Sequence, residues 1–408
     1  MTGNELIPHL FRTEYSRITA VLSKYFGIEH LDMAEDIASE TFLMAVDTWP
    51  YKGVPPNPQA WLYAVAKNKA KNHLARNKIF RKKISGKIKH TDWYAEDADI
   101  DLSGKNITDS QLEMLFTVCH PSVSEEAQVC LALRVLCGFG IDEIAGAFFT
   151  NKETIHKRLQ RAKEKLRSEN IQMAMPLQEQ MKARLDTVLR TIYLLFSEGY
   201  YSESHPSLIR KELCIEAINL TSLLLDNEAT NTHAANALMS LMCFHSSRLD
   251  ARFTDNNDMI VYDEQDENRW DTELIEKGFY YLQQASKWEV TSKYYLEASI
   301  AYWHTVKTDA REKWESILRL YDLLIQIENS PAAMLNRVYA LSKVKGNEAA
   351  VAEAEKMNMP GNHFYYILLA ELYKNSGREK VKECFTKALS VCKNETEKQF
   401  ILKKMNML

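Results

Sequence analysis

The spacing of apolar residues constrains the fold of this chain more than any other feature. Apolar side chains recur every three to four positions along most of the sequence, which places them on one face of an α-helix. We find no convincing run in which apolar and polar residues alternate, as they do in a half-buried strand. Glycine and proline, which interrupt helices, number only 13 and 10 among 408 residues. The sequence therefore predicts an all-α fold.

The length of the chain and the positions of its helix-breaking and linker segments predict several domains. A chain of 408 residues with 46% apolar residues can bury more than one core. Residues 1–85 predict a first helical domain with helices over 7–26, 33–48 and 58–83. A rigid loop with four prolines and one glycine is expected over 49–58. Residues 86–108 read as an acidic linker, 109–170 as a second helical domain, and 176–408, after Pro176, as a long helical series.

Several classes of protein are disfavoured. No stretch approaches 18 uncharged apolar residues, and the N-terminus lacks the apolar core of a signal peptide. Seven scattered cysteines without a CxxC pair are typical of a reducing cytoplasm. Cys119-His120 has no second ligand pair at zinc spacing, so we expect neither a metal site nor a cofactor. A phosphate-binding glycine loop and a nucleophile motif are also missing from the sequence, so we do not expect an enzyme.

A basic segment follows the proline-rich loop. Residues 61–89 contain ten lysines and arginines and no acidic residue, a composition that neutralises nucleic-acid phosphates. Trp61 and Tyr63 add rings that could stack on unpaired bases. Taken alone, a solvated basic helix with a core tryptophan explains the segment at least as well. The candidate nucleic-acid contacts are Trp61, Tyr63, Lys67, Asn68, Lys71, Asn72 and Arg76.

Residues 141–166 have the spacing of a helix-turn-helix. Ala145 is the small residue at which two helices meet, and Ile155, ten positions later, is the apolar residue that the second helix inserts. Asn151 or Thr150 can cap that second helix. A charged helical hairpin without any role in DNA binding is the alternative. Ile155, Leu159, Ala162 and Leu166 are expected to face inward, and Lys152, Glu153, His156, Lys157, Arg161 and Lys163 outward.

Together with residues 34–43 (AEDIASETFL), these segments resemble the extracytoplasmic-function class of bacterial RNA polymerase sigma factors over about residues 8–168. The resemblance implies that residues 34–43 dock on the polymerase clamp, with Glu35, Asp36 and Glu40 as acidic contacts. It implies that residues 61–76 open and read the −10 element, and that loop 49–58 lies beside a pocket for a flipped base. The second helix of the helix-turn-helix would read the −35 element through Lys152, Glu153, His156, Lys157, Arg158 and Arg161.

Motifs farther along the chain resemble the ECF42-like subgroup, whose members carry a C-terminal tetratricopeptide-type extension. They stand at residues 120–122 (HPS), 193–200 (YLLFSEGY), 264–266 (EQD), 269–271 (RWD) and 335–337 (LNR). Residues 340–347 and 370–377 also resemble the turn region of such repeats. The resemblance implies a cytoplasmic sigma factor whose partners are core RNA polymerase, through its β′ clamp and β flap, and promoter DNA. It also implies control by the extension.

A helical solenoid presents a concave groove, so the extension is expected to bind an unknown ligand or protein. Candidates for a pocket in it are Tyr200, Tyr201, Asp266, Arg269 and Trp270, although Asp266 and Arg269 also have the spacing of a structural ion pair. Two other functions compete with the sigma factor. A helix-turn-helix regulator that binds duplex DNA alone leaves the basic segment 61–89 without a purpose. A scaffold would use both basic stretches only as solvated faces.

Overall fold

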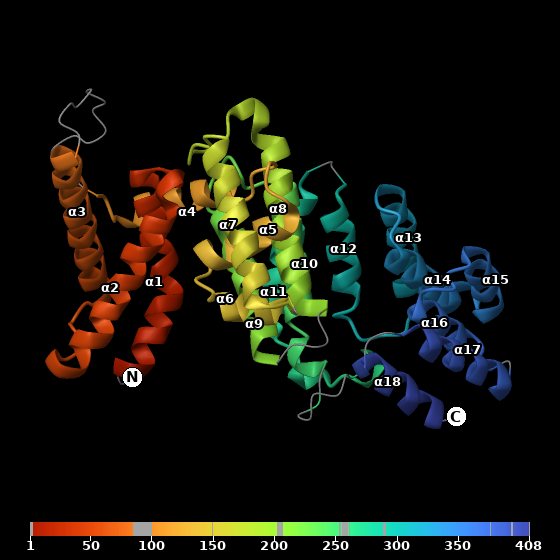
Figure 1. Ribbon diagram of the computed structural model, residues 1–408. Helices are drawn as coiled ribbons and strands as arrows, with labels where there is room; N and C mark the ends of the chain where they lie inside the picture. The colour runs from red at the N-terminus through yellow and green to blue at the C-terminus, as the bar shows by residue number, and fades with distance from the viewer. Residues whose placement is uncertain are drawn as a thin grey trace. The chain divides into compact units, whose positions relative to one another are not determined.

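The computed structural model describes residues 3–84, 100–148, 150–201, 207–252, 254, 260, 262–288, 291–375, 377–392 and 395–407. Every regular element in these ranges is a helix and none is a strand, which confirms the predicted all-α class. Among the described helices, none combines the length and apolarity needed to cross a membrane. The chain divides into two compact units, residues 1–198 and 199–408 (Figure 1).

Unit 1 contains three long N-terminal helices, then several shorter elements, and one long helix at its end. The three are α1 (Gly3–Phe26), α2 (Leu31–Lys52) and α3 (Pro58–Ile84), and the short 3-10 turn η1 (Ile28–His30) separates α1 from α2. The remaining elements are α4 (Gly104–Val118), α5 (Glu125–Leu131), the π-helical turn η2 (Ala132–Leu136), α6 (Ile141–Ala147), α7 (Lys152–Ser168) and α8 (Gln178–Tyr201), which ends just beyond the unit.

The end of α2 corrects the predicted loop over 49–58. The helix continues through Pro50 to Lys52, so the loop spans only residues 53–57. Pro50 is tolerated because it lies in the exposed last turn, where water can solvate the carbonyl that loses its partner. Gly53 stops the helix instead, because its φ of 82° lies in the left-handed region, and its N–H donates to the Trp49 carbonyl at 3.0 Å.

A single hydrophobic core joins α1, α2 and α3. Its buried members include Tyr15, Leu22, Phe42, Trp49 and Leu62. Ile100, just before α4, and Ile107, within it, belong to the same core. Helix α4 begins at Gly104, four residues before the expected end of the acidic linker, and residues 86–99 of that linker lie outside the described part of the chain. The division into four domains remains a prediction.

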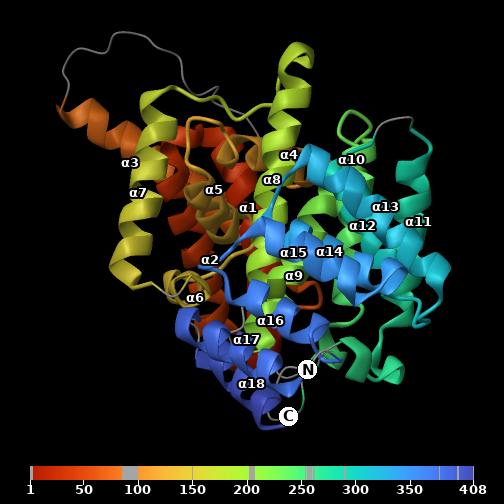
Figure 2. The ribbon, with the colours of Figure 1, turned by 90° about the vertical axis from the view of Figure 1, so that its right-hand side faces the viewer.

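Unit 2 is a succession of helices in which sequence neighbours pack against each other (Figure 2). The most extensive contacts join α10 to α11 and α12, α13 to α14, and α16 to α17. The elements are α9 (Ser207–Leu225), α10 (His233–Ser246), η3 (Leu249–Ala251), η4 (Tyr262–Glu264), η5 (Glu267–Arg269), α11 (Thr272–Ser286), α12 (Lys293–Trp303), α13 (Arg311–Ile327), α14 (Pro331–Lys345), α15 (Asn347–Met357), α16 (His363–Leu372), α17 (Arg378–Val391) and α18 (Glu395–Asn406).

Candidate functional site

Helix α2 carries its acidic residues on two different faces. The inward face follows a stripe with three- and four-residue spacing that includes Leu31, Ala38, Phe42 and Trp49, all buried. Glu35 lies on this same stripe, and only 5% of its surface is exposed. A carboxylate in such a position must be paired, because burying an isolated charge is very costly.

The outward face of α2 combines carboxylates with apolar side chains. Asp36, Glu40 and Asp47 are exposed. Leu43 and Met44, on the same face, expose 60% and 45% of their surface. Glu40 accepts a hydrogen bond from the Nζ of Lys69 on α3 at 2.8 Å. Exposed apolar side chains beside charges are typical of a surface that another protein covers.

Buried Glu35 is paired with cations from two later elements. Its Oε1 lies 2.9 Å from the Nε of Arg134, which belongs to η2. Its Oε2 accepts from the Nζ of Lys163 on α7. The Arg134 side chain also donates to the Phe139 carbonyl at 3.1 Å, which holds it in place. Glu35 therefore fastens the helix-turn-helix region to α2.

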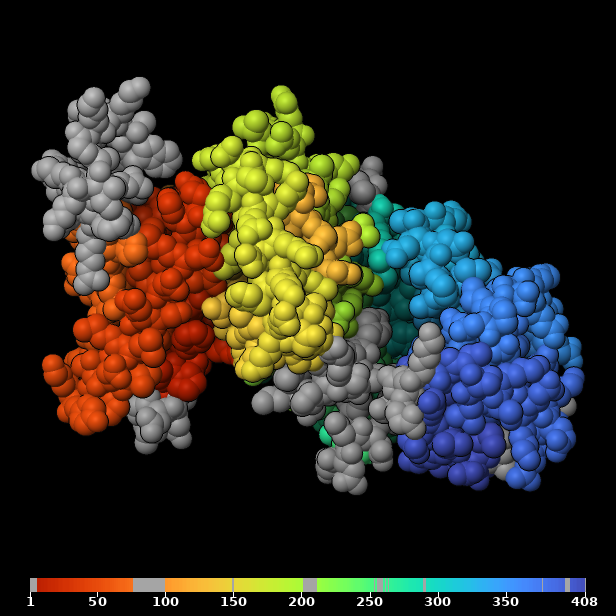
Figure 3. Space-filling view, in the orientation of Figure 1, coloured from red at the N-terminus to blue at the C-terminus, as the bar shows by residue number. Residues whose placement is uncertain are grey.

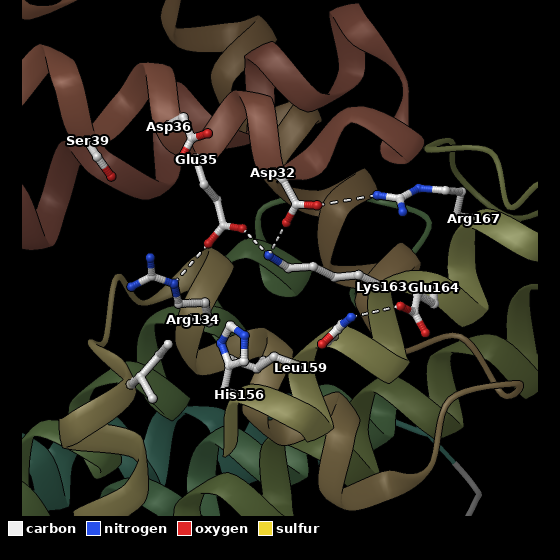
Figure 4. Close-up of a pocket in the computed structure, with 12 residues that line it drawn as sticks. Asp32, Glu35, Asp36, Ser39, Arg134, His156, Leu159, Lys163, Glu164 and Arg167 are labelled. Atoms are coloured by element: carbon white, nitrogen blue, oxygen red, sulfur yellow. Dashed lines mark hydrogen bonds and ion pairs between the residues drawn. The ribbon is translucent and has the colours of Figure 1, made fainter. Parts of the chain in front are cut away.

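Asp32, one turn earlier on α2, widens this ion-pair cluster. Its Oδ1 lies 2.7 Å from Lys163 Nζ, and its Oδ2 lies 3.3 Å from the Nη2 of Arg167. Arg167 Nε also donates to the Glu29 carbonyl at 3.1 Å. We call Asp32, Glu35, Arg134, Lys163 and Arg167 the α2–α7 ion-pair cluster. Figure 4 shows these side chains converging from α2, α7 and η2.

The ion-pair cluster forms part of the wall of a cavity of about 450 Å³ between α2 and α7. Asp36, His156 and Leu159 add to its lining (Figure 4). In the space-filling view, the yellow surface of α6 and α7 lies directly beside the red surface of α1 and α2 (Figure 3). Arg12 on α1 adds a further link, since its Nη2 lies 2.6 Å from Glu143 on α6.

Both partners of the Lys163–Asp32 pair have displaced pKa values. Burial acts to lower the pKa of Lys163, but the charge of Glu35 and the hydrogen bonds to Asp32 and Glu35 outweigh burial and raise that pKa above 10.5. Burial acts to raise the pKa of Asp32, but Lys163 and Arg167 outweigh burial and lower that pKa below 3.8. Both groups are therefore charged throughout the neutral range.

On α3, the two aromatic candidates turn toward the protein. Trp61 packs edge-to-face on Trp49, with ring centroids 5.4 Å apart. The Tyr63 hydroxyl donates to Glu14 Oε2 at 2.5 Å and accepts from Gln59. Burial and then Glu14 raise the pKa of Tyr63 to about 12. Both rings are half-buried, so neither is displayed as an open stacking face in this arrangement.

The polar candidates on α3 lie on its outer face. Asn68, Lys71 and Asn72 are exposed, and Lys67 is half-buried. A hollow of about 400 Å³ lies between α3 and residues 100–102, and Lys67 is among the α3 residues that line it. The side chain of Arg76 lies outside the described residues, as do the side chains of all later cations in the basic segment.

The two helices expected over residues 141–166 are present as α6 and α7, which pack against each other, and the DNA-binding role of the pair stays a prediction. The Asn151 side chain caps α7 by accepting from the Thr154 N–H at 2.7 Å, which settles the choice between the two expected caps. On α6, the Glu143 carboxylate accepts from the Gly140 N–H at 2.6 Å. The four residues predicted to face inward are all buried, namely Ile155, Leu159, Ala162 and Leu166.

Five of the six residues expected to face outward from α7 do so, but Lys163 does not. Only 16% of the Lys163 side chain is exposed, because it belongs to the ion-pair cluster. Arg158 is half-buried, with its guanidinium 3.4 Å from Glu126 Oε2 and 3.7 Å from Cys130 Sγ on α5. The residues that remain exposed are Lys152, Glu153, His156, Lys157 and Arg161.

The pocket candidates of the C-terminal region do not share one environment. Tyr200 and Trp270 are buried, with 6% and 7% of their surface exposed. Asp266 and Arg269 are exposed, and Asp266 caps η5 by accepting from the Asn268 N–H. The side chain of Tyr201 lies outside the described residues.

The sequence reasoning missed Asp32, Arg134 and the inward position of Lys163. One signal was available, because Glu35 interrupts an otherwise apolar stripe and therefore requires a cation. Lys163 flanks the apolar stripe of α7, four residues after Leu159 and three before Leu166. Sequence spacing alone could not show which cation would meet Glu35, because that partner stands 128 positions away.

Comparisons with known proteins bear on both units. Residues 10–79, which span most of α1, all of α2 and most of α3, match the family model of Sigma-70 region 2. Residues 184–286 match a family of unknown function, DUF6596. An uncharacterized protein of Rhizobium meliloti (strain 1021) is 30% identical over 395 residues, which cover 95% of this chain and 92% of that protein. No solved structure matches the chain.

The region 2 match coincides with the three-helix core that carries the outward face of α2 and the basic face of α3. The relative covers both units, so the likeness extends beyond the region 2 domain. The chain therefore carries a segment that matches sigma-70 region 2, and it belongs over nearly its whole length to the same family as the Rhizobium meliloti protein.

Proposed function

We propose that the protein is a sigma factor that binds core RNA polymerase and directs it to promoters. The observation that carries this proposal is the outward face of α2, which lies inside the segment matched by Sigma-70 region 2. Asp36 and Glu40 supply charge on this face, and Leu43 and Met44 supply apolar area. We assign this face to the β′ clamp. Glu35, the third acidic residue of the segment, is buried in the ion-pair cluster and is available only if that cluster opens.

The DNA contacts follow from the same assignment. Helix α3 would hold the −10 element through Lys67, Asn68, Lys71 and Asn72, whose side chains lie on or near its outer face. Trp61 and Tyr63 would contribute by stacking only after turning away from Trp49 and Glu14. Arg76 belongs to the same proposal. Helix α7 would read the −35 duplex through Lys152, Glu153, His156, Lys157 and Arg161, with Arg158 reaching the backbone from its place beside α5.

Simultaneous contact with both promoter elements requires the α2–α7 ion-pair cluster to separate. The two elements lie about 25 base pairs apart, or roughly 85 Å along B-DNA. A compact unit of this size has a radius of gyration of roughly 16 Å, and α7 contacts α2 directly through Lys163. We infer that the ion-pair cluster holds the free protein in a closed arrangement and that polymerase binding opens it.

The C-terminal helices would regulate these steps. We propose that they form the tetratricopeptide-type extension of an ECF42-like sigma factor, and that a ligand or protein bound there controls promoter use. The helical pairs of unit 2 are compatible with such an extension. The protein would act in the cytoplasm, where polymerase and promoters are located.

Transcription by purified core polymerase on genomic promoters, with and without this protein, tests the proposal. Leu43→Arg is expected to reduce core binding at least tenfold, because it places a charge in the apolar part of the α2 face. Leu177→Arg is the matched control, because Leu177 is also exposed, at 70%, but directly precedes α8 instead of belonging to α2. Asp36→Arg, with Asp186→Arg on α8 as its control, tests the acidic part of the face.

The stand-alone regulator makes the opposite prediction. It requires specific binding to duplex DNA without polymerase, and it predicts that Leu43→Arg and Asp36→Arg behave like their controls. Promoter-specific transcripts that depend on both the protein and the α2 face would exclude this alternative. Their absence, together with specific duplex binding by the protein alone, would overturn the sigma-factor proposal.

A further inference from the structure

Three side chains with different donor atoms converge in unit 2. His363 is the first residue of α16, Cys392 directly follows the last residue of α17, and Glu397 lies in the first turns of α18. His363 Nε2 lies 2.8 Å from Glu397 Oε2, and Cys392 Sγ lies 3.4 Å from the same oxygen. All three donor atoms lie within 4.8 Å of one another. The helices that carry them are neighbours in Figure 2.

The imidazole nitrogen of this trio is not satisfied by the protein. His363 Nε2 is buried and has no hydrogen-bond partner, because its short approach to Glu397 lacks the geometry of a hydrogen bond. The imidazole ring packs on Phe364, with centroids 4.0 Å apart, which restricts its rotation. A buried imidazole nitrogen without a hydrogen-bond partner, close to a carboxylate oxygen, is costly unless a proton or a metal ion satisfies both groups.

The donor distances fit a tetrahedral ion after a small adjustment. Bond lengths of about 2.0 Å to nitrogen and oxygen and about 2.3 Å to sulfur require donor separations of roughly 3.3 Å for N–O and 3.5 Å for S–O. The observed values of 2.8 and 3.4 Å need to open by only about half an ångström. The side chains of His363 and Glu397 are 18% and 15% exposed, so an ion can reach the trio from solvent.

The chemistry of the donors selects the class of ion. A thiolate and an imidazole favour Zn²⁺ and related transition metals over Mg²⁺ and Ca²⁺, which prefer oxygen ligands. One thiolate and one carboxylate together carry two negative charges, which a divalent cation neutralises. Three protein ligands leave a fourth position for water or for an additional ligand.

We propose that His363, Cys392 and Glu397 bind one zinc-class divalent ion that ties α18 to the ends of α16 and α17. The site stands independently of the sigma-factor assignment, since it rests on residues of unit 2 alone. Ile401 on α18 is fully buried in the core shared with α16 and α17. The ion would therefore strengthen an existing attachment of α18, and its gain or loss would change how firmly the C-terminal end is held.

Metal titration of the untagged full-length protein, reduced and freed of metal by a chelator, tests the site. One equivalent of Co²⁺ is expected to produce a thiolate-to-metal charge-transfer band, and Zn²⁺ is expected to displace it. Zn²⁺ binding is expected to raise the temperature at which the C-terminal end becomes susceptible to protease, because binding stabilises the state that holds the ion. Mg²⁺ is expected to produce neither effect.

Matched cysteine variants locate the ion. Cys392→Ser is expected to abolish the charge-transfer band and to weaken Zn²⁺ binding at least tenfold. Cys384→Ser, which changes another buried cysteine of the same core, is expected to retain both. His363→Gln is expected to weaken binding without changing the reactive thiol content.

Two results would overturn the proposal. The first is a wild-type protein that binds less than one equivalent of Co²⁺ without a thiolate band, which would leave the trio as a histidine–carboxylate ion pair beside a thiol. The second is an equal loss of the band in Cys384→Ser and Cys392→Ser, which would place the ion elsewhere or attribute the loss to misfolding. Neither result would depend on whether the protein supports transcription.

Discussion

Two neighbouring acidic residues on α2 show how strongly one position changes the role of a side chain. Glu35 is 5% exposed and bound by Arg134 and Lys163, whereas Asp36 is exposed. Their side chains differ by about 100° around the helix axis, which is enough to turn one toward the core and the other toward solvent. Buried Glu35 acts within the protein, and exposed Asp36 is free to meet another molecule.

Removing the central cation of the ion-pair cluster should destabilise unit 1. Lys163→Met keeps the length and helix propensity of the side chain but leaves Arg134 as the cation that still pairs with Glu35, beside the Tyr15 hydroxyl. We therefore expect a loss of about 2–3 kcal/mol in the free energy of unfolding. Urea denaturation of the full-length protein measures it. Lys165→Met is the control, because Lys165 is exposed and its ion pair is with Glu169, the exposed residue that caps the end of its own helix, and its effect should be much smaller. Equal effects of the two variants would contradict the assignment.

The pKa values of the ion-pair cluster predict the pH range in which its contribution to the free energy of unfolding is lost. Asp32 has a pKa below 3.8 in the folded protein, so its stabilisation is complete above that value and is lost as the pH falls through the lowered pKa. Lys163 has a pKa above 10.5, so its stabilisation is complete below 10.5 and is lost as the pH rises beyond the raised pKa. The stability difference between wild type and Lys163→Met should therefore be constant from about pH 5 to about pH 9 and shrink in stronger acid. A difference that changes near pH 7 would implicate another group.

At the scale of elements, the helices and their inward faces could be predicted from the sequence, but the helix ends were predicted less accurately. The apolar period placed Ile155, Leu159 and Leu166 inside α7 correctly, because burial of a stripe is a local property of a helix. The loop was wrongly expected to begin at Trp49, just before Pro50, whereas α2 continues to Lys52. The error arose because proline breaks a helix only where the lost hydrogen bond cannot be replaced, and that depends on exposure, which the sequence does not state.

The packing of α10 against α11 gives a test at this scale. Gly278 on α11 faces Phe244 on α10, and a Cβ at this position would lie 2.8 Å from the Phe244 ring. Gly278→Ala should therefore lower the unfolding midpoint, with a loss of about 1–3 kcal/mol, because Phe244 is fully buried and cannot move away easily. Thermal unfolding followed by circular dichroism measures the midpoint. Gly146→Ala is the helical control, since nothing lies within 4 Å of its Cβ, and it should be neutral or slightly stabilising. A Gly278→Ala midpoint at or above that of wild type would contradict the described contact.

At the scale of the whole molecule, the contacts between segments that are distant in the sequence could not be predicted from the sequence. The sequence predicted a basic outer face on α7 that included Lys163, yet this side chain lies against α2. Periodicity separates apolar from polar positions, but it does not tell which polar residue meets solvent and which meets a charge from another helix. The convergence of His363, Cys392 and Glu397 was not predicted for the same reason, because the histidine is far from the cysteine in the chain.

Opening of the closed arrangement can be followed by energy transfer between fluorophores. Labels incorporated at exposed Thr13 on α1 and exposed Ser168 on α7 should show high transfer in the free protein and low transfer in a promoter complex with polymerase. The reason is that the −10 and −35 elements separate the two regions by roughly 85 Å. Labels at Thr13 and Ala75, both within the three-helix core region, should show no change. Unchanged transfer between Thr13 and Ser168 in an active promoter complex would show that the ion-pair cluster stays closed.

The α2–α7 ion-pair cluster also restricts how this protein can evolve. A change of charge at position 35 alone would leave Arg134 and Lys163 facing each other across a buried site, so it would be tolerated only with a compensating change elsewhere. Positions 32 and 35 should therefore covary with 134, 163 and 167 among related chains, whereas exposed Asp36 should covary with positions of the polymerase. The residues of α2 would thus be constrained by two separate sets of contacts, one within the chain and one with the polymerase.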